Sequence, residues 1–340
     1  MSKSKSLLKL PNSRILITGA CGSVGSALVK RLLNEGHIVC AFDNNEDGLF
    51  KLDQEHTNRN EKLRIFLGDV RDIKRVRDAM ERVDYVFHCA GLKHVYLSEY
   101  NPFEAVQTNV IGSNNIIKAA LNANVSSVIF TSSDKAVNPT STMGASKLLA
   151  ERLFTSANYH AGTNKTKFAV VRFGNVLNTN GSILQIFQKQ LNENQPLTIT
   201  STKMTRFFLT MSQSIDLCIK AAKDMIGGEI FIKNMGSCNI MTLAKIITGN
   251  TEKFNFVEVG CKPGEKLYEE LITDVESTRT VAIKDIFVIL PEVGNYSNET
   301  TQKCYLKYKN HKFVNKAIRS DTGLLDEDKV RSMLNNASLK

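Results

Sequence analysis

The sequence predicts an α/β fold in which a doubly wound parallel sheet is interleaved with a smaller C-terminal region. Short apolar runs alternate with amphipathic helical patterns through the first half of the 340-residue chain, as in parallel sheets with helices on both faces. A glycine-rich turn joins the first run to the first helix, and polar residues follow several later runs. Ligands of such folds bind at the carboxyl ends of the strands, so a functional site is expected there.

The first predicted strand spans residues 13–18 and leads into a turn with the pattern G-x-x-G-x-x-G, followed by a helix to Asn34. Glycines let the backbone turn tightly and approach a pyrophosphate, which then sits at the positive end of the helix. The residues assigned to this phosphate-binding turn are Gly19, Gly22, Ser23, Val24 and Gly25.

Asp43 follows the second predicted strand, residues 37–42, and stands eighteen positions after Gly25. A carboxylate at this place accepts hydrogen bonds from ribose hydroxyls and repels a 2′-phosphate. The sequence therefore indicates NAD as the cofactor and disfavours NADP.

The alternation continues with strands expected at 63–67 and 85–89 and a long helix from Phe103 to about Ala123. Ala90 and Gly91 follow the fourth strand, and small residues there let the loop pass close to a cofactor. The first four strands of the parallel sheet should therefore lie within residues 13–89.

The stretch 131–147, T-S-S-D-K-A-V-N-P-T-S-T-M-G-A-S-K, has the composition of an active site. Asp134 and Lys135 follow the fifth strand, and a helix beginning near Thr142 places Met143 and Lys147 one turn apart on one face. A thioether has no acidic proton, so Met143 cannot transfer one. Buried neighbours of opposite charge can shift each other's pKa, which makes Asp134 and Lys135 the candidate acid–base pair.

Beyond this stretch the alternation loosens. We expect a central strand at 165–172, a short strand outside the main sheet at 195–200, a ligand-facing loop at 204–208, a late sheet strand at 228–232, a sharp turn into a helix at 261–271 and a final short helix at 325–334. The second half should therefore supply both sheet strands and ligand-binding loops.

Composition describes an ordinary globular chain, with 42% hydrophobic residues and length for one large or two modest domains. Seven cysteines without a C-x-x-C pair predict reduced thiols, with neither a metal site nor a disulfide framework. No signal segment or membrane-spanning run is visible, which predicts a cytoplasmic protein. The net charge of +10 is spread along the chain apart from a lysine cluster at 303–312, so no nucleic-acid or membrane partner is expected.

Taken together, these patterns resemble the extended short-chain dehydrogenase/reductase superfamily, and within it the UDP-N-acetylglucosamine 4,6-dehydratases of polysaccharide and glycan synthesis. The resemblance runs from about residue 13 to 273. It is carried by S-S-D-K-A-V-N-P-T-S-T-M-G-A-S-K, L-K-H-V-Y-L-S-E-Y-N-P, V-R-F-G-N-V-L, M-T-R-F-F and P-G-E-K-L-Y-E-E-L. Short-chain dehydrogenases usually carry a tyrosine at the position of Met143, but methionine is typical of one branch.

The resemblance implies a Rossmann core and a reaction in which carbon 4 of the sugar is oxidised, water leaves across carbons 5 and 6, and the hydride stored on NAD returns to carbon 6. It implies catalytic roles for Ser133, Asp134, Lys135, Met143 and Lys147. It adds Asp69, Val70, Ala90, Gly91, Lys93, Asn109 and Lys147 to the cofactor site. It places Lys93, Asn175, Ser182, Arg206 and Glu265 at the UDP-sugar.

The resemblance also suggests three regions: an NAD-binding core at 13–175, a mainly UDP-sugar-binding region at 176–290 that adds late strands to the sheet, and a C-terminal extension at 291–340. A homo-oligomer is expected. The protein is also expected to be soluble, since the long N-terminal membrane segment of some relatives is absent. Lys262 departs from the arginine that relatives usually carry before P-G-E-K, which weakens any two-oxygen phosphate contact there. A nucleotide-sugar 4-epimerase and a non-catalytic NAD-binding sensor remain the alternatives.

Overall fold

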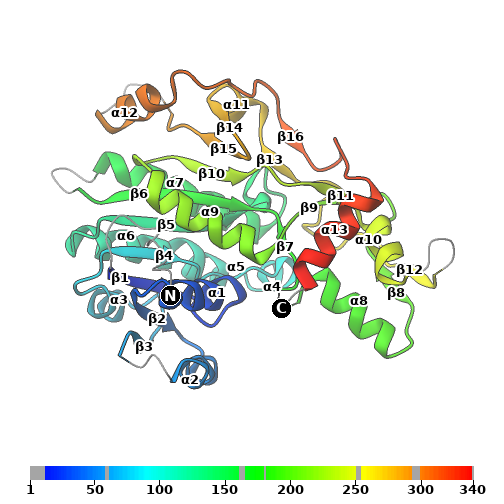
Figure 1. The fold of residues 1–340 in the computed structure, drawn as a ribbon, viewed down its shortest axis with the longest axis horizontal. Helices are drawn as coiled ribbons and strands as arrows, with labels where there is room; N and C mark the ends of the chain where they lie inside the picture. Colours follow the sequence, from blue (N-terminus) through cyan, green and yellow to red (C-terminus); the bar gives the residue numbers. More distant parts are fainter. Residues whose placement is uncertain are drawn as a thin grey trace, which may run out of the picture.

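A nine-stranded sheet forms the centre of the computed structural model, which describes residues 12–57, 61–160, 165–179, 181–249, 254–292 and 299–338 (Figure 1). Its strands lie in the order β14-β15-β10-β6-β5-β4-β1-β2-β3. The strands from β3 to β10 pair in parallel, whereas β15 and β14 are antiparallel at one edge. The predicted doubly wound parallel sheet is confirmed.

The strands of this sheet are β1 (Arg14–Thr18), β2 (Ile38–Asp43), β3 (Leu63–Leu67), β4 (Tyr85–His88), β5 (Ser127–Ser133), β6 (Lys167–Phe173), β10 (Ile230–Lys233), β14 (Thr280–Ile283) and β15 (Ile286–Ile289). The central ones consist largely of buried β-branched and aromatic residues, as expected of strands covered on both faces. They correspond to the strands predicted near 13–18, 37–42, 63–67, 85–89, 165–172 and 228–232.

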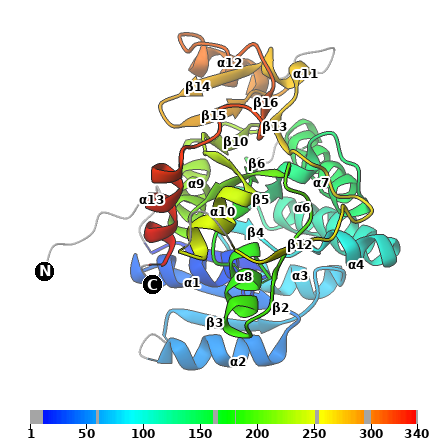
Figure 2. The ribbon, with the colours of Figure 1, turned by 90° about the vertical axis from the view of Figure 1, so that its right-hand side faces the viewer.

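Helices cover both faces of the sheet. The helices in the first two-thirds of the chain are α1 (Ser23–Asn34), α2 (Glu46–Glu55), α3 (Ile73–Ala79), α4 (Val95–Tyr100), α5 (Pro102–Ala105), α6 (Gly112–Asn122), α7 (Thr142–His160), α8 (Ile183–Asn192) and α9 (Met211–Asp224). Helices α1 and α9 pack together on one face, and α3, α6 and α7 on the other (Figures 1 and 2). This sandwich leaves the carboxyl ends of the parallel strands at one edge.

A second, smaller core lies beyond that edge (Figure 1). Its strands and neighbouring short strands are β7 (Asn175–Val176), β8 (Leu197–Ile199), β9 (Thr205–Leu209), β11 (Ser237–Asn239), β12 (Phe256–Glu258), β13 (Glu270–Ile272) and β16 (Ile318–Arg319). The later helices are α10 (Ile240–Ile247), α11 (Asp274–Ser277), α12 (Glu299–Tyr308) and α13 (Glu327–Ser338). Helix α13 packs on α10 (Figure 2), so the end of the chain contributes to this core.

Three local predictions need correction. The loop predicted at 204–208 is a strand from Thr205 onward, because β9 is fully buried and pairs with β7 and β11. The stretch 261–271 does not enter a helix; it forms a turn with Gly264 at φ +82° and leads into β13. The long helix from Phe103 to Ala123 contains a π-helical segment, Val106–Ile111, between α5 and α6. In each case tertiary packing outweighed the local pattern.

Candidate active site

The glycine turn between β1 and α1 forms a close-packed cradle. Gly19 has φ +68°, and a Cβ on it would lie 2.6 Å from the Ala90 backbone nitrogen. A Cβ on Gly25 would lie 2.0 Å from the Gly19 carbonyl oxygen. Gly22 is the N-cap of α1, and Ser23, Val24 and Gly25 form its first turn. The turn thus leads closely into a helix N-terminus that no side chain caps, an arrangement that fits the pyrophosphate of a dinucleotide.

Asp43 ends β2 beside this cradle. Its carboxylate accepts hydrogen bonds from the backbone N–H of Cys21 (2.9 Å) and of Asn45 (3.0 Å), which fixes its position at the turn. Asp69 follows β3 nearby, and Arg71 holds the pKa of that carboxyl below its usual range through hydrogen bonds. Two carboxylates therefore lie on the adenosine side predicted for the cofactor, and Val70 next to them is buried.

Asn109 holds the loop after β4 from inside the π-helical segment. Its Oδ1 accepts from the Leu92 N–H (2.8 Å), and its Nδ2 donates to the Leu92 carbonyl (3.1 Å) and to Ser146 Oγ (2.9 Å). A Cβ on Gly91 would lie 2.9 Å from both Asn109 Oδ1 and Lys147 Nζ. The loop of Ala90, Gly91 and the exposed Lys93 is thereby fixed against helix α7.

Lys147 is buried in α7, with its Nζ donating to the Thr131 carbonyl (3.2 Å) and lying 4.8 Å from the Phe130 ring centroid. Burial lowers the pKa of this amine to about 8, against the opposing effects of Cys89 and Glu151. Met143, one turn earlier, is 2% exposed. The thioether is thus closed off from solvent and offers the site no proton.

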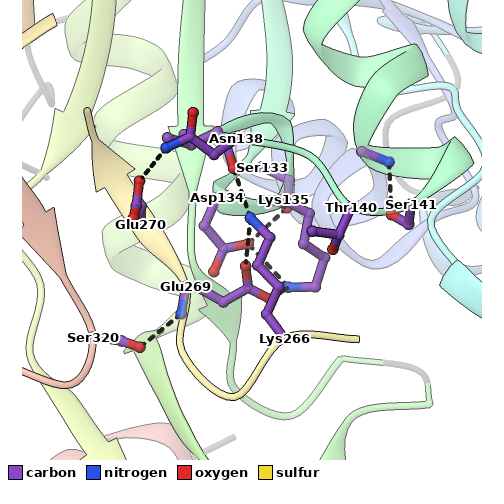
Figure 3. Close-up of polar contacts among 12 residues, drawn as sticks. Ser133, Asp134, Lys135, Asn138, Thr140, Ser141, Lys266, Glu269, Glu270 and Ser320 are labelled. Atoms are coloured by element: carbon purple, nitrogen blue, oxygen red, sulfur yellow. Dashed lines mark hydrogen bonds and ion pairs between the residues drawn. The ribbon is translucent and has the colours of Figure 1, made fainter. Parts of the chain in front are cut away.

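Asp134 and Lys135 form an ion pair immediately after β5 (Figure 3). Lys135 Nζ lies 3.0 Å from Asp134 Oδ1, which also accepts a hydrogen bond from Ser133 Oγ at 2.9 Å. Asp134 is fully buried and its Oδ2 has no hydrogen-bond partner in the structure. This carboxylate oxygen is therefore both buried and without a partner in the structure.

Glu269 joins this pair and was not assigned a role from the sequence. Its Oε1 lies 3.5 Å from Lys135 Nζ and 3.9 Å from Arg206 Nε, and the residue is 2% exposed. Glu269 directly precedes β13, which begins at Glu270. Adjacent residues of an extended segment point to opposite faces, so an extended segment in place of the predicted helix would have indicated that only one of the two glutamates points inward. The outward one, Glu270, accepts instead from Asn138 Nδ2 (Figure 3).

The charges in this cluster shift one another's proton affinity. Burial opposes the charged form of Lys135, but the carboxylates of Asp134 and Glu269 outweigh it and raise the pKa of the amine. Burial raises the pKa of Glu269, against the effects of Lys135 and Arg206. Lys135 is therefore an ammonium at neutral pH in the absence of substrate.

The predicted substrate residues come from several loops around this cluster. Arg206 reaches it through Glu269, and its guanidinium also donates to the Thr205 and Lys266 carbonyls, each at 2.8 Å. Asn175 Oδ1 and Ser182 Oγ are buried without a hydrogen-bond partner in the structure, and a bound polar ligand would supply one.

Glu265 lies in the loop before β13 and accepts from the Lys262 N–H at 3.1 Å. Lys93 belongs to a different loop, the one after β4. The ammonium of Lys262 itself lies 5.9 Å from the Tyr96 ring centroid. The structure thus brings Arg206 to the Asp134–Lys135 pair and leaves Lys93 and Glu265 on two flanking loops.

The sheet, the glycine cradle and the Asp134–Lys135–Lys147 arrangement define a protein with the extended short-chain dehydrogenase/reductase fold. A family described as polysaccharide biosynthesis protein matches residues 15–291, and the chain belongs to this family. The structure named Pen from Bacillus thuringiensis superimposes with a TM-score of 0.88 at 38% identity, covering 97% of this chain and 99% of that one.

Relatives with similar sequences have several descriptions. An uncharacterised membrane protein of Methanocaldococcus jannaschii is 46% identical over 89% of this chain and 92% of its own. A UDP-N-acetylglucosamine 4,6-dehydratase (inverting) of Campylobacter jejuni is 37% identical, covering 82% and 83%. A UDP-glucose 4-epimerase of Rickettsia conorii is 36% identical, covering 81% and 82%. Among the described residues of the present chain, no helix has both the length and the apolar character needed to cross a membrane.

Proposed function

We propose that this protein catalyses the NAD-dependent 4,6-dehydration of UDP-N-acetylglucosamine to a UDP-2-acetamido-2,6-dideoxy-hexos-4-ulose, for the synthesis of rare amino sugars. The observation that carries the proposal is the buried Asp134–Lys135 ion pair at the carboxyl end of β5. It provides an acid and a base where Met143 provides neither. Support also comes from the 37% identical Campylobacter relative, which is a UDP-N-acetylglucosamine 4,6-dehydratase (inverting).

Each residue has a distinct task in the proposed mechanism. Bound NAD would supply a temporary store for the hydride between carbon 4 and carbon 6. Asp134 takes the proton of the carbon 4 hydroxyl and later gives it to the hydroxyl that leaves carbon 6 as water. Lys135 takes the carbon 5 proton, which is acidified by the adjacent ketone. Ser133 hydrogen-bonds near carbon 4, and Lys147 holds the nicotinamide ribose and adds positive potential.

The proposed cofactor is NAD because the Asp43 carboxylate at the end of β2 would accept hydrogen bonds from the adenosine ribose. A 2′-phosphate would meet unfavourable electrostatics there. Denatured protein should release mainly NAD into the supernatant, as measured by liquid chromatography. Release of mainly NADP would refute the assignment.

The second candidate is a nucleotide-sugar 4-epimerase, which the rickettsial relative favours by its name. Epimerisation needs a base at carbon 4 only, so it leaves Lys135 without a task. A non-catalytic NAD-binding sensor leaves the whole buried Asp134–Lys135 pair without a task.

We also propose a cytoplasmic location, since all seven cysteines are free thiols, as is usual in reducing compartments.

The deciding experiment is incubation of the purified protein with UDP-N-acetylglucosamine and no added cofactor, followed by mass spectrometry and NMR. The proposal expects a product lighter by one water. A product of unchanged mass with inverted carbon 4 would identify an epimerase. Unchanged substrate, with bound NAD confirmed, would favour the sensor.

A further inference from the structure

We infer that Glu269 is a positioning residue that holds the amino group of Lys135 opposite Asp134 and receives its proton when Lys135 must act as a base. The chemical consequence rests on the proposed dehydration, whereas the contact itself does not. The observation behind it is a lysine held between two buried carboxylates from distant parts of the chain (Figure 3).

The position of Glu269 is fixed by its backbone. Its N–H donates to Ser320 Oγ at 2.9 Å, and its carbonyl accepts from the Ser320 N–H at 2.9 Å. Ser320 is fully buried beside Thr205 of β9, with 2.9 Å between the two hydroxyl oxygens. The C-terminal part of the chain therefore fixes the backbone of the residue that contacts Lys135, and Glu269 itself is 2% exposed.

Lys266 lies in the same loop as Glu269, before β13, and is the next cation in the cluster. Its Nζ donates to the Val137 carbonyl at 2.7 Å and lies 3.9 Å from Glu269 Oε2. The charged groups that face Lys135 are thus Asp134 on its own segment, Glu269 before β13 and Arg206 on β9, with Lys266 behind Glu269. Lys135 faces Glu269 Oε1 at 3.5 Å, so Oε1 is the oxygen that would receive its proton.

The contact with Glu269 gives the Lys135 ammonium a group to which it can lose a proton. Lys135 is an ammonium before substrate binds, and an ammonium cannot remove the carbon 5 proton. If its proton moves to Glu269, a neutral amine and a neutral carboxylic acid replace a buried ion pair, and burial favours the neutral forms. The amine then takes the proton from carbon 5 and returns one to carbon 5 after the hydroxyl has left. Asp134 separately moves the hydroxyl proton from carbon 4 to water, so the protons balance.

The contact can be tested without any substrate. Lysine side chains labelled with ¹³C are followed by NMR as pH rises in the full-length protein, with Lys135→Met used to assign the resonance. Removing a carboxylate at this distance should lower the titration midpoint of Lys135 by about one to three pH units in Glu269→Gln. Glu270→Gln is the matched control, since it removes the neighbouring charge that points away, and it should leave the midpoint unchanged.

Turnover provides the second readout. Glu269→Gln should lower kcat at least about tenfold with little change in KM, and the limb of the pH profile that reports Lys135 should move to lower pH. Glu269→Asp keeps the charge, so its limb should stay near that of the wild type and part of kcat should return. A Lys135 midpoint that is the same in Glu269→Gln and wild type overturns the inference, even if dehydration is confirmed. A moved midpoint in a protein that forms no dehydrated product upholds the contact and refutes the proposed function.

Discussion

Met143 lies in the first turn of α7, one turn before Lys147, and its side chain is closed off from solvent. The residue types at 133–135 could be identified from the sequence because a strand end followed by an acid and a base is a local pattern. The partners of those residues could not. Glu269 is 134 positions beyond Lys135, and only the folded chain shows which of two adjacent glutamates points inward.

The first prediction concerns proton transfer. Asp134→Asn and Lys135→Met should each lower turnover by about a hundredfold or more, the usual scale for the loss of a general acid or base. The dissociation constant of the UDP-sugar, measured by calorimetry, should change far less. Near-normal dehydration by Asp134→Asn would remove that residue from the mechanism.

Met143→Tyr gives a matched test of the same prediction. A phenol placed in the buried thioether position has no surroundings arranged to orient it or lower its pKa, so Met143→Tyr should not fully restore turnover to Asp134→Asn. Full restoration of turnover would mean that the surroundings of position 143 can still orient a catalytic tyrosine, for which the Asp134–Lys135 pair is a substitute. Loss of all activity in Met143→Ala would point to a direct role for the thioether.

The second prediction concerns pH and the buried His88, which lies between Thr18 Oγ1 (2.6 Å) and Ser113 Oγ (3.2 Å). Burial, and then the nearby Lys147, lowers the pKa of His88 from 6.5 to about 3. Between these values the unfolded chain binds a proton that the folded chain does not, so stability falls as pH drops from about 6.5 towards 3. In His88→Gln this dependence should become shallower by up to about 1.4 kcal/mol per pH unit.

Urea unfolding at several pH values between about 4.5 and 6.5 measures the slope of the free energy of unfolding. His311→Gln is the control, since His311 is exposed on the surface, and its slope should match that of the wild type. An unchanged slope in His88→Gln would show that the folded protein tolerates a charged imidazole at this position.

At the scale of the element, periodicity predicted the parallel strands from β3 to β10 and the long helices, but not the antiparallel edge of the sheet. The hairpin of β14 and β15 was not predicted. It lies in the region at 176–290, for which the only late sheet strand expected was at 228–232. Residues 261–271 contain good helix formers, yet Gly264 at φ +82° packs against Ser141 and Val95, and Thr140 Oγ1 donates to the Gly264 carbonyl. These long-range contacts hold the stretch as a loop over the site, and no local pattern reports them.

The third prediction concerns the ion network that joins β6, α7 and α11. Arg172, 1% exposed, hydrogen-bonds both carboxylate oxygens of Glu151 and of Glu276. Arg172→Met leaves two buried carboxylates without their cation, so it should lower the free energy of unfolding by about 3–5 kcal/mol. Adding Glu151→Gln and Glu276→Gln should recover part of that loss.

Urea denaturation followed by circular dichroism measures this loss. Arg152→Met on the exposed face of α7 is the matched control and should change stability by less than about 0.5 kcal/mol. If Arg172→Met unfolds at the wild-type urea concentration, the network does not hold these elements together.

At the scale of the whole molecule, the sequence predicted a doubly wound parallel sheet with an interleaved smaller C-terminal region, and the structure shows two hydrophobic clusters. The end of the chain returns to earlier elements, because β16 pairs with β13 and α13 packs on α10. Such returns depend on tertiary pairing of very short strands. The surface also could not be predicted in detail, since exposure of an apolar side chain depends on which face its helix presents.

The fourth prediction concerns self-association through α4, α5 and α7. These neighbouring helices expose large apolar side chains: Tyr96, Leu97, Tyr100, Phe103 and Leu149, each more than half exposed. An isologous pairing of two copies would bury this surface. Light scattering at micromolar concentration should give at least twice the chain mass of 37.9 kDa, and Tyr100→Lys with Leu149→Lys should lower it. A monomeric mass for the wild type would refute the pairing.

The central claim is that carbon 4 is oxidised and its hydride returned to carbon 6 while Asp134 and Lys135 move the protons. The most direct measurement uses UDP-N-acetylglucosamine carrying deuterium at carbon 4, incubated with the protein without added cofactor and analysed by NMR and mass spectrometry. The account predicts a product lighter by one water with the deuterium at carbon 6. Deuterium that remains at carbon 4, whether in unchanged substrate or in its carbon 4 epimer, would contradict it.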